Sequence, residues 1–260
     1  MSVLIDGGYI AHFRFYATVQ WWRLAKPTLE IEDNIESFKN AYNERFCKCL
    51  NDFLQKNNLV GQQVILASDP PTRNLWRSRL FEDYKGGRQV KDSVKTAMYA
   101  CFDRNNLSSL CESSGIKLVG HPELEADDCI AILIKQLLVP TPITVITSDH
   151  DYLQLCSQDV RLLTLKGTIL EPTVSPQISL ASKIIGGDKS DNIPSLFSRC
   201  GPKTAQMLAL HPDKLEAKVA RLTPEEKQVY ESRLALNTQL IDFNRIPSQL
   251  VTEFQSSLSE

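Results

Sequence analysis

Residues 143–149 of the chain are Ile143-Thr144-Val145-Ile146-Thr147-Ser148-Asp149, a β-rich run that ends shortly before an aspartate. Two further runs have the same form: residues 3–5 before Asp6, and residues 64–67 before Asp69. Continuous apolar runs of this length are typical of strands that are buried on both faces, as in a parallel sheet. Ligands of such sheets bind beyond the carboxyl ends of the strands, so we expect the three aspartates to meet at one edge.

Helical patterns lie between the strand candidates. Residues 38–54 carry apolar side chains at roughly helical spacing. The i, i+3, i+4, i+7 rule is followed by Ile130, Leu133, Ile134 and Leu137. Residues 116–119 and 160–165 are two more candidate strands. Strands that alternate with helices indicate an α/β fold with a central, mostly parallel sheet and helices on both faces.

The character of the sequence changes after about Glu171. Prolines and glycines interrupt the chain there, and the remainder up to Glu260 has the pattern of helices and turns. We therefore expect a first domain at residues 1–172 and a helical second domain at residues 173–260.

The composition excludes several classes of protein. The chain has 260 residues, 42% of them hydrophobic, and a formal net charge of -2, so any basic surface must be local. Its seven cysteines include no C-x-x-C pair, and its four histidines have no zinc-site spacing, which favours reduced thiols over a disulfide framework. The N-terminus lacks the pattern of a signal peptide, and no stretch is apolar enough to span a bilayer. We expect an intracellular, cytoplasmic protein of a bacterium or a virus-infected cell.

Carboxylates are the strongest chemical signal. Nine acidic residues fall into five groups at expected strand ends, helix starts or glycine-flanked turns: Asp6; Asp69; Glu125, Asp127 and Asp128; Asp149 and Asp151; Asp188 and Asp191. Carboxylates that converge on one edge repel one another, and a hard cation relieves this repulsion. A site of carboxylates without His or Cys favours Mg²⁺ or Mn²⁺ over zinc. Two such ions about 4 Å apart can activate a water and stabilise the leaving oxygen of a phosphodiester.

Each acidic group taken alone has a structural alternative. Glu125 and Asp128 are three residues apart and share a face on a helix, whose N-terminus interacts favourably with acids. Asp149 and Asp151 are compatible with a turn or a cap. The coincidence of all five groups is what favours a metal site.

Four segments resemble motifs of the flap endonuclease and phage 5′-exonuclease family and occur in the family's order. Residues 125–128 are identical to its E-A-D-D motif, residues 147–155 resemble T-G-D-K-D-x-x-Q-L, residues 187–194 resemble G-D-x-S-D-N-I-P, and residues 4–7 resemble the opening strand. The resemblance extends from residue 3 to about residue 205. Ser68 before Asp69 and His150 inside the D-x-D depart from the pattern, but neither removes a ligand.

The resemblance implies a PIN-like nuclease domain with a helical arch, followed by a helix–three-turn–helix in the second domain. It also implies two metal ions. The first would be held by Asp6, Asp69, Glu125 and Asp127, and the second would be held or surrounded by Asp149, Asp151, Asp188 and Asp191. Asp128 would contact either ion through water, and Asp149 and Asp151 would be essential for catalysis.

The basic segment Tyr84-Lys85-Gly86-Gly87-Arg88 resembles the family's Y-K-x-x-R, which opens the helical arch. The resemblance implies that Tyr84 stacks on a base and that Lys85 and Arg88 stabilise charge on the scissile phosphate. The alternative, a solvated helix face, is the interpretation we prefer for the basic residues that follow, Lys91, Lys95 and Arg104.

The segment Gly201-Pro202-Lys203-Thr204-Ala205 resembles the end of the family's DNA-binding hairpin, where backbone amides and a potassium ion meet phosphates. Residues 195–200 lack the usual glycines and include Arg199. Two alternatives follow: a retained potassium site, or phosphate contacts made mainly by the side chains of Arg199 and Lys203, with Thr204 beside them.

The sequence therefore predicts a Mg²⁺-dependent, structure-specific 5′ nuclease that acts in DNA replication and repair. Its expected partners are branched, nicked or 5′-ended DNA, with RNA:DNA as an alternative. We expect a monomer with no membrane association, and residues near the C-terminus show no Q-x-x-L-x-x-F-F clamp-binding box. The competing hypotheses are a catalytically weak nucleic-acid-binding relative and a phosphatase of another α/β family.

Overall fold

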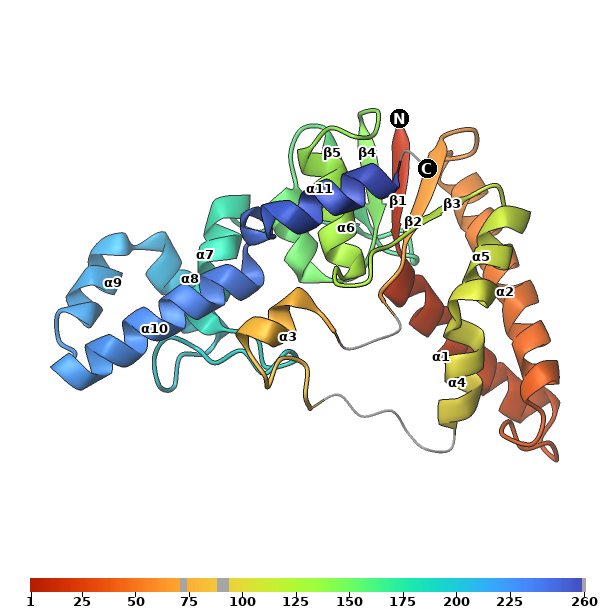
Figure 1. Ribbon diagram of the computed structural model, residues 1–260, viewed down its shortest axis with the longest axis horizontal. Coiled ribbons are helices and arrows are strands. Elements are labelled where there is room, and N and C mark those ends of the chain that lie inside the picture. Colours follow the sequence, from red (N-terminus) through yellow and green to blue (C-terminus); the bar gives the residue numbers. More distant parts are fainter. Residues whose placement is uncertain (71–73, 88–93, 259–260) are drawn as a thin grey trace. The chain divides into compact units, whose positions relative to one another are not determined.

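The computed structural model describes residues 1–70, 74–87 and 94–258 (Figure 1). The chain forms two compact units, and each is built from segments that are separate in sequence. The first unit contains Met1–Thr72, Gln89–Asp149 and Ser157–Leu170, and the second contains Arg73–Arg88, His150–Cys156 and Glu171–Glu260.

A six-stranded sheet forms the centre of the first unit. Its strands are β1 (Ser2–Asp6), β2 (Gln63–Ala67), β3 (Lys117–Val119), β4 (Ile143–Ile146), β5 (Val160–Leu163) and β6 (Ile169–Leu170), in the order β3-β2-β1-β4-β5-β6. All pairs are parallel except the antiparallel pair β5–β6. The strand candidates and the mostly parallel sheet predicted from the sequence are therefore confirmed.

Helices cover both faces of this sheet, which explains why its central strands β1 and β4 are almost wholly buried. Val3 and Ile5 on one face of β1 belong to a core cluster with α1 (Gly7–Ala25), α2 (Ile35–Lys56), α4 (Lys95–Phe102) and α5 (Arg104–Ser113). Leu4 points to the opposite face and is also fully buried. The helix α6 (Ala126–Lys135) contacts β1 and β2 and contributes none of the described residues of that cluster.

Helix α1 follows β1 without a loop, and sequence reasoning did not find it. Its sequence begins with two glycines and is rich in aromatic residues, which are poor signals for a helix. Gly7 allows the immediate turn, because a Cβ at this position would lie closer than 3.0 Å to the backbone of Ala67. The Asp6 side chain caps the helix by accepting a hydrogen bond from the Tyr9 amide at 3.0 Å.

The second unit is helical. It contains α3 (Trp76–Leu80), η2 (His150–Leu155), α7 (Pro176–Gly186), α8 (Pro202–Leu210), α9 (Pro212–Val219), α10 (Pro224–Ile241), η3 (Phe243–Arg245) and α11 (Ser248–Ser257). Helices α7 and α8 pack closely and share an apolar cluster with residues from α10 (Figure 1). The predicted helical hairpin is thus α7, residues 187–201 and α8.

The predicted division into residues 1–172 and 173–260 stays a prediction. Two short segments before residue 172, of which the structure describes residues 74–87 and 150–156, belong to the same compact unit as the helices that follow it. Gln154 shows how η2 is held there, because its side chain donates to the Ile241 carbonyl at 3.1 Å and accepts from the Phe243 amide at 3.1 Å.

Candidate active site: two groups of carboxylates

The first unit gathers six of the predicted acids. Asp6 ends β1, and Asp69 and Asp149 follow β2 and β4. Thr147 connects two of these positions, because its hydroxyl donates to Asp6 Oδ2 at 2.9 Å and accepts from the Asp149 amide at 3.1 Å. The expectation that the aspartates after β1, β2 and β4 share the carboxyl edge of the sheet agrees with this arrangement.

The remaining three acids of this unit stand at the start of α6. Carboxylate oxygens of Glu125, Asp127 and Asp128 all lie within 4.8 Å of one another, close enough to share an ion. Asp69 connects this group to the end of β2, because its Oδ1 accepts from the Ala126 amide at 2.9 Å. Asp128 is fully buried and accepts from the Glu125 amide at 3.2 Å, so it also serves the helix cap that sequence analysis named as its alternative role.

The charge state of Asp6 reflects the surrounding acids. The pKa of Asp6 is raised to about 6: burial is the largest cause, and the charges of Asp69 and Asp149 add to it, while hydrogen bonds from Tyr9 and Thr147 partly offset the rise. A buried carboxylate that resists ionisation beside other carboxylates is stabilised by a bound cation. Protons would compete with that cation as the pH falls through about 6.

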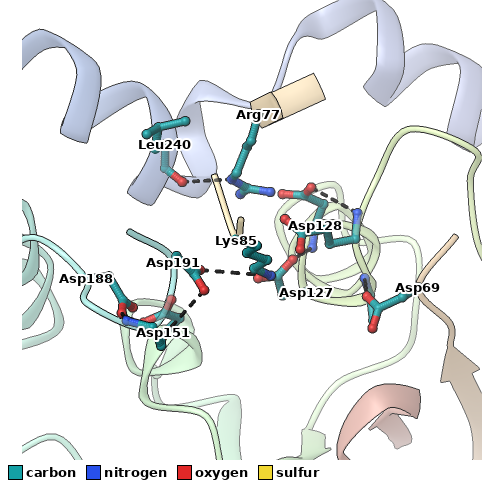
Figure 2. A network of polar contacts seen from close by, with 12 residues as sticks. Asp69, Arg77, Lys85, Asp127, Asp128, Asp151, Asp188, Asp191 and Leu240 are labelled. Carbon is teal, nitrogen blue, oxygen red and sulfur yellow. Dashed lines mark hydrogen bonds and ion pairs between the residues drawn. The ribbon is translucent and has the colours of Figure 1, made fainter. Parts of the chain in front are cut away.

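The second unit holds the other three acids, together with two lysines. Lys183 of α7 forms ion pairs with Asp151 and with Asp188, the latter at 2.7 Å between Nζ and Oδ2. Lys85 Nζ lies 3.9 Å from Asp191 Oδ2, as Figure 2 shows. Asp191 is buried, and the other two carboxylates are mostly covered. This group of acids is therefore already partly neutralised by the protein's own cations.

Asp188 remains ionised in this setting. Burial would raise its pKa, but hydrogen bonds from Lys183 and Ser190, with the charge of Lys183, outweigh burial and lower the pKa to about 2. Asp188 thus carries a full negative charge at any pH where the protein is expected to act.

A tight turn positions Asp188 and Asp191. The amide of Asp188 donates to the Ile193 carbonyl at 2.9 Å, and the amide of Ile193 donates back to Asp188 at 2.7 Å. Gly187 precedes the turn with a φ of +67°, and a Cβ there would lie closer than 3.0 Å to backbone atoms of Ile193 and Pro194. A glycine is required here by both backbone conformation and space.

We expect Gly187→Ala to destabilise the protein more than Gly167→Ala does. Gly167 also has a left-handed φ, of +83°, but no atom lies within 4 Å of its Cβ position. Both variants incur left-handed strain of about 1 kcal/mol, and only Gly187→Ala adds overpacking of about 1–3 kcal/mol. Urea unfolding measures the difference, and equal losses would mean that the turn adapts freely.

Residues 83–85 lie beside this turn in the second unit. The Lys85 amide donates to the Asp191 carbonyl at 3.1 Å, and the Asn192 side chain donates to the Asp83 carbonyl at 3.0 Å. The backbone therefore places Lys85 next to Asp191. Tyr84 is only 7% exposed and packs with Ile193, Leu240 and Ile241, so its ring has a packing role, and the stacking role stays a prediction.

The remaining residues of the predicted site are Arg88 and those of the helical hairpin. Arg88 lies outside the described residues, as do residues 89–93, into which the predicted arch would continue. In the helical hairpin, Arg199, Lys203 and Thr204 are exposed, and Lys203 and Thr204 stand in the first turn of α8. Arg199 adopts a φ of +55°, so a non-glycine residue supplies the left-handed turn in a loop that lacks the family's glycines.

Sequence reasoning assigned no role to two residues that the structure places in these groups. Thr147 belongs to the motif of residues 147–155 and directly follows β4. This position at a strand end is the sequence feature that could have indicated its hydrogen bond to Asp6. Lys183 stands in the last turn of α7, outside every quoted motif, and no sequence signal separates it from other helical lysines.

Comparison with known proteins identifies the family of the chain. The family model described as 5′-3′ exonuclease, N-terminal resolvase-like domain, matches residues 1–179. The chain belongs to this family. The matched residues include all six acids of the first unit, and Asp151 from the second.

The curated relatives include a 5′-3′ exonuclease and DNA polymerases I. A 5′-3′ exonuclease of Bacillus subtilis is 33% identical over 51% of this chain and 47% of its own length. A thermostable DNA polymerase I of Thermus filiformis is 27% identical over 79% of this chain and 23% of its own length. The chain thus spans less than half the length of these two relatives.

Solved structures show the same fold. The bacteriophage T5 flap endonuclease, in a pseudo-enzyme-product complex with DNA and metal ions, has a TM-score of 0.70 at 15% identity and covers 99% of this chain and 97% of its own. A T5 protein co-crystallized with metal ions has a TM-score of 0.68 at 13% identity, covering 99% and 98%. These likenesses support a PIN-like fold. Among the described residues, no helix is long and apolar enough to cross a membrane.

Proposed function

We propose that this chain is a metal-dependent, structure-specific 5′ nuclease that hydrolyses phosphodiester bonds near 5′ ends, flaps or RNA primers of branched or nicked DNA. The observation that carries the proposal is the set of carboxylates at the sheet edge of the first unit, with Asp6 ionising only near pH 6 among its acidic neighbours. Six acids in one place have a high electrostatic cost in a protein that does not use them to bind a cation.

The donor set fits divalent ions with a preference for oxygen. Asp6, Asp69, Glu125 and Asp127 would hold the first ion, and Asp128 would act through water. The family resemblance assigned Asp149 to the second ion, but its charge raises the pKa of Asp6, so we propose that it lies beside the first ion. Asp151, Asp188 and Asp191 would hold the second. Carboxylates without His or Cys favour Mg²⁺ or Mn²⁺. When bound, such ions lower the pKa of water and stabilise charge on the phosphate.

The protein's own groups would do the remaining work. Asp6, held by Tyr9 and Thr147, keeps a fixed orientation at the end of β1. Lys85 is anchored through its backbone while its ammonium lies beside Asp191, so it can turn toward a scissile phosphate and offset the charge that develops there. Arg88 would add a second cation.

DNA would be bound by the helical hairpin. The first turn of α8 contains Lys203 and Thr204, and no side chain of the described residues caps its N-terminus, an arrangement that suits a phosphate. Arg199 is exposed in the preceding loop. We favour side-chain contacts by Arg199 and Lys203 over a bound K⁺ ion, and replacement of K⁺ by Na⁺ at constant ionic strength separates the two. The division at residue 172, a monomeric state and an intracellular, cytoplasmic location belong to the same proposal.

Metal removal tests the proposed function. A 5′-labelled flap, a nicked duplex and an RNA:DNA hybrid are each incubated with Mg²⁺, with Mn²⁺ and with excess EDTA. We expect cleavage of at least one substrate with either ion and none with EDTA, because the metal ions would lower the pKa of the attacking water and stabilise charge on the phosphate. Undiminished cleavage in EDTA would contradict the proposal, and so would the absence of cleavage of all three substrates with either ion.

A further inference from the structure

Lys183 holds an unusual position among the acids of the second unit. Its ammonium forms ion pairs with both Asp151 and Asp188, which come from η2 and from the turn after α7. The three side chains are 25%, 19% and 13% exposed, so water screens these pairs only partly. One lysine therefore bridges two carboxylates that the proposed function assigns to the second metal ion.

A cation between two carboxylates satisfies the same oxygens that a divalent ion would bind. Lys183 is placed there by α7, whose last turn carries it, and by the Asp188–Ile193 turn that brings Asp188 toward it. Lys189, the other lysine close in sequence, is exposed and forms no ion pair among those seen in the described residues. The bridging position is thus specific to Lys183.

We propose that Lys183 is a tethered cation that competes with the second divalent ion for Asp151 and Asp188, and that it must move away before this ion binds. This inference rests on the proposed function, because it assumes that the second group is a metal site. Lys183 acts as a positioning residue: it keeps the two carboxylates together without a metal, and it makes the second ion bind more weakly than the first. The second ion would then bind stably only when something else, such as the substrate's phosphates, adds negative charge.

The size of the effect follows from competition. When the lysine-displaced state is populated only to about a tenth, the apparent affinity for the ion is reduced about tenfold. Removal of the charge of Lys183 should therefore raise the apparent affinity for the second ion about tenfold. Removal of the charge of Lys189, which does not bridge the acids, should leave this affinity unchanged.

Direct metal binding tests the inference without any activity measurement. Mn²⁺ is titrated into the full chain and followed by electron paramagnetic resonance, with Lys183→Met, Lys183→Arg and the charge-matched control Lys189→Met. We expect a tight and a weak site in the unmodified protein. Lys183→Met should tighten the weak site about tenfold or more, whereas Lys183→Arg and Lys189→Met should leave it within about twofold.

The outcomes separate this inference from the proposed function. Two sites that are unchanged in Lys183→Met, or equally tightened in Lys189→Met, would overturn the inference and leave the function standing. Binding of no Mn²⁺ at all would overturn both. A purely structural role would lower the melting temperature of Lys183→Met equally with and without Mn²⁺, whereas competition predicts that saturating Mn²⁺ restores it.

A measurement on the unmodified protein covers the case in which Lys183→Met does not fold. Reductive methylation followed by mass spectrometry reports the reactivity of each lysine. Lys183 should be protected in EDTA and should react several times faster at saturating Mg²⁺, while exposed Lys189 reacts equally in both. Unchanged protection of Lys183 at saturating Mg²⁺ would mean that the lysine stays in place, and the inference would fail.

Discussion

Asp149→Asn is expected to reduce the rate of cleavage by on the order of a thousandfold, which corresponds to about 4 kcal/mol of lost transition-state stabilisation. Asp149 is exposed at the end of β4, and its amide is bonded to Thr147. Asparagine has the same shape, so the backbone bond and the fold should persist. The variant loses a negative charge that lies close enough to Asp6 to raise its pKa, and with that charge it loses part of the attraction for a cation.

The measurement is single-turnover cleavage of a 5′ flap, with DNA affinity determined separately by fluorescence anisotropy. DNA binding should be retained or tightened, because removal of a carboxylate reduces repulsion of the phosphates. Asp159→Asn removes an equally exposed aspartate of the same unit, before β5, and should leave cleavage unchanged. Near-normal turnover of Asp149→Asn would mean that the site has been assigned to the wrong edge.

Lys85→Ala is expected to lower kcat by on the order of a hundredfold, or about 3 kcal/mol, with little change in KM. A cation directed at charge that develops only in the transition state affects turnover more than binding. Lys85 has a φ of +56°, and alanine and lysine tolerate this conformation about equally, so the turn should survive. The hydrogen bond from the Lys85 amide to the Asp191 carbonyl involves only the backbone, so it is also kept.

Steady-state kinetics on the flap substrate separates the two possible roles of Lys85. Lys85→Arg should recover part of the activity because it restores the charge, and Lys189→Ala controls for the loss of a lysine elsewhere in the second unit. A weaker Kd with unchanged kcat would make Lys85 a docking residue. In that case the proximity of its ammonium to Asp191 would have only an electrostatic role in the free protein.

Much of the fold was determined by local sequence patterns. The apolar runs before Asp6, Asp69 and Asp149 predicted three parallel strands. A strand that is covered by helices on both faces is buried on both, so its residues are apolar without alternation. Parallel strands align their carboxyl ends, so the same pattern predicted that the aspartates after them lie at one edge. Helical spacing predicted that Glu125 and Asp128 share a face, whereas Asp127 was assigned to the site only through the family resemblance. The structure places carboxylate oxygens of all three close together.

Only the tertiary structure decided which charges accompany the acids and which side chains are covered. Tyr84 has the composition of a stacking residue, yet Ile193, Leu240 and Ile241 bury it, and these contacts join parts of the chain more than a hundred residues apart. Lys183 stands outside the motifs, and its pairing with Asp151 and Asp188 depends on how η2, α7 and the following turn pack. Sequence patterns report the periodicity of neighbouring residues, whereas these pairings depend on long-range packing, which no local pattern encodes.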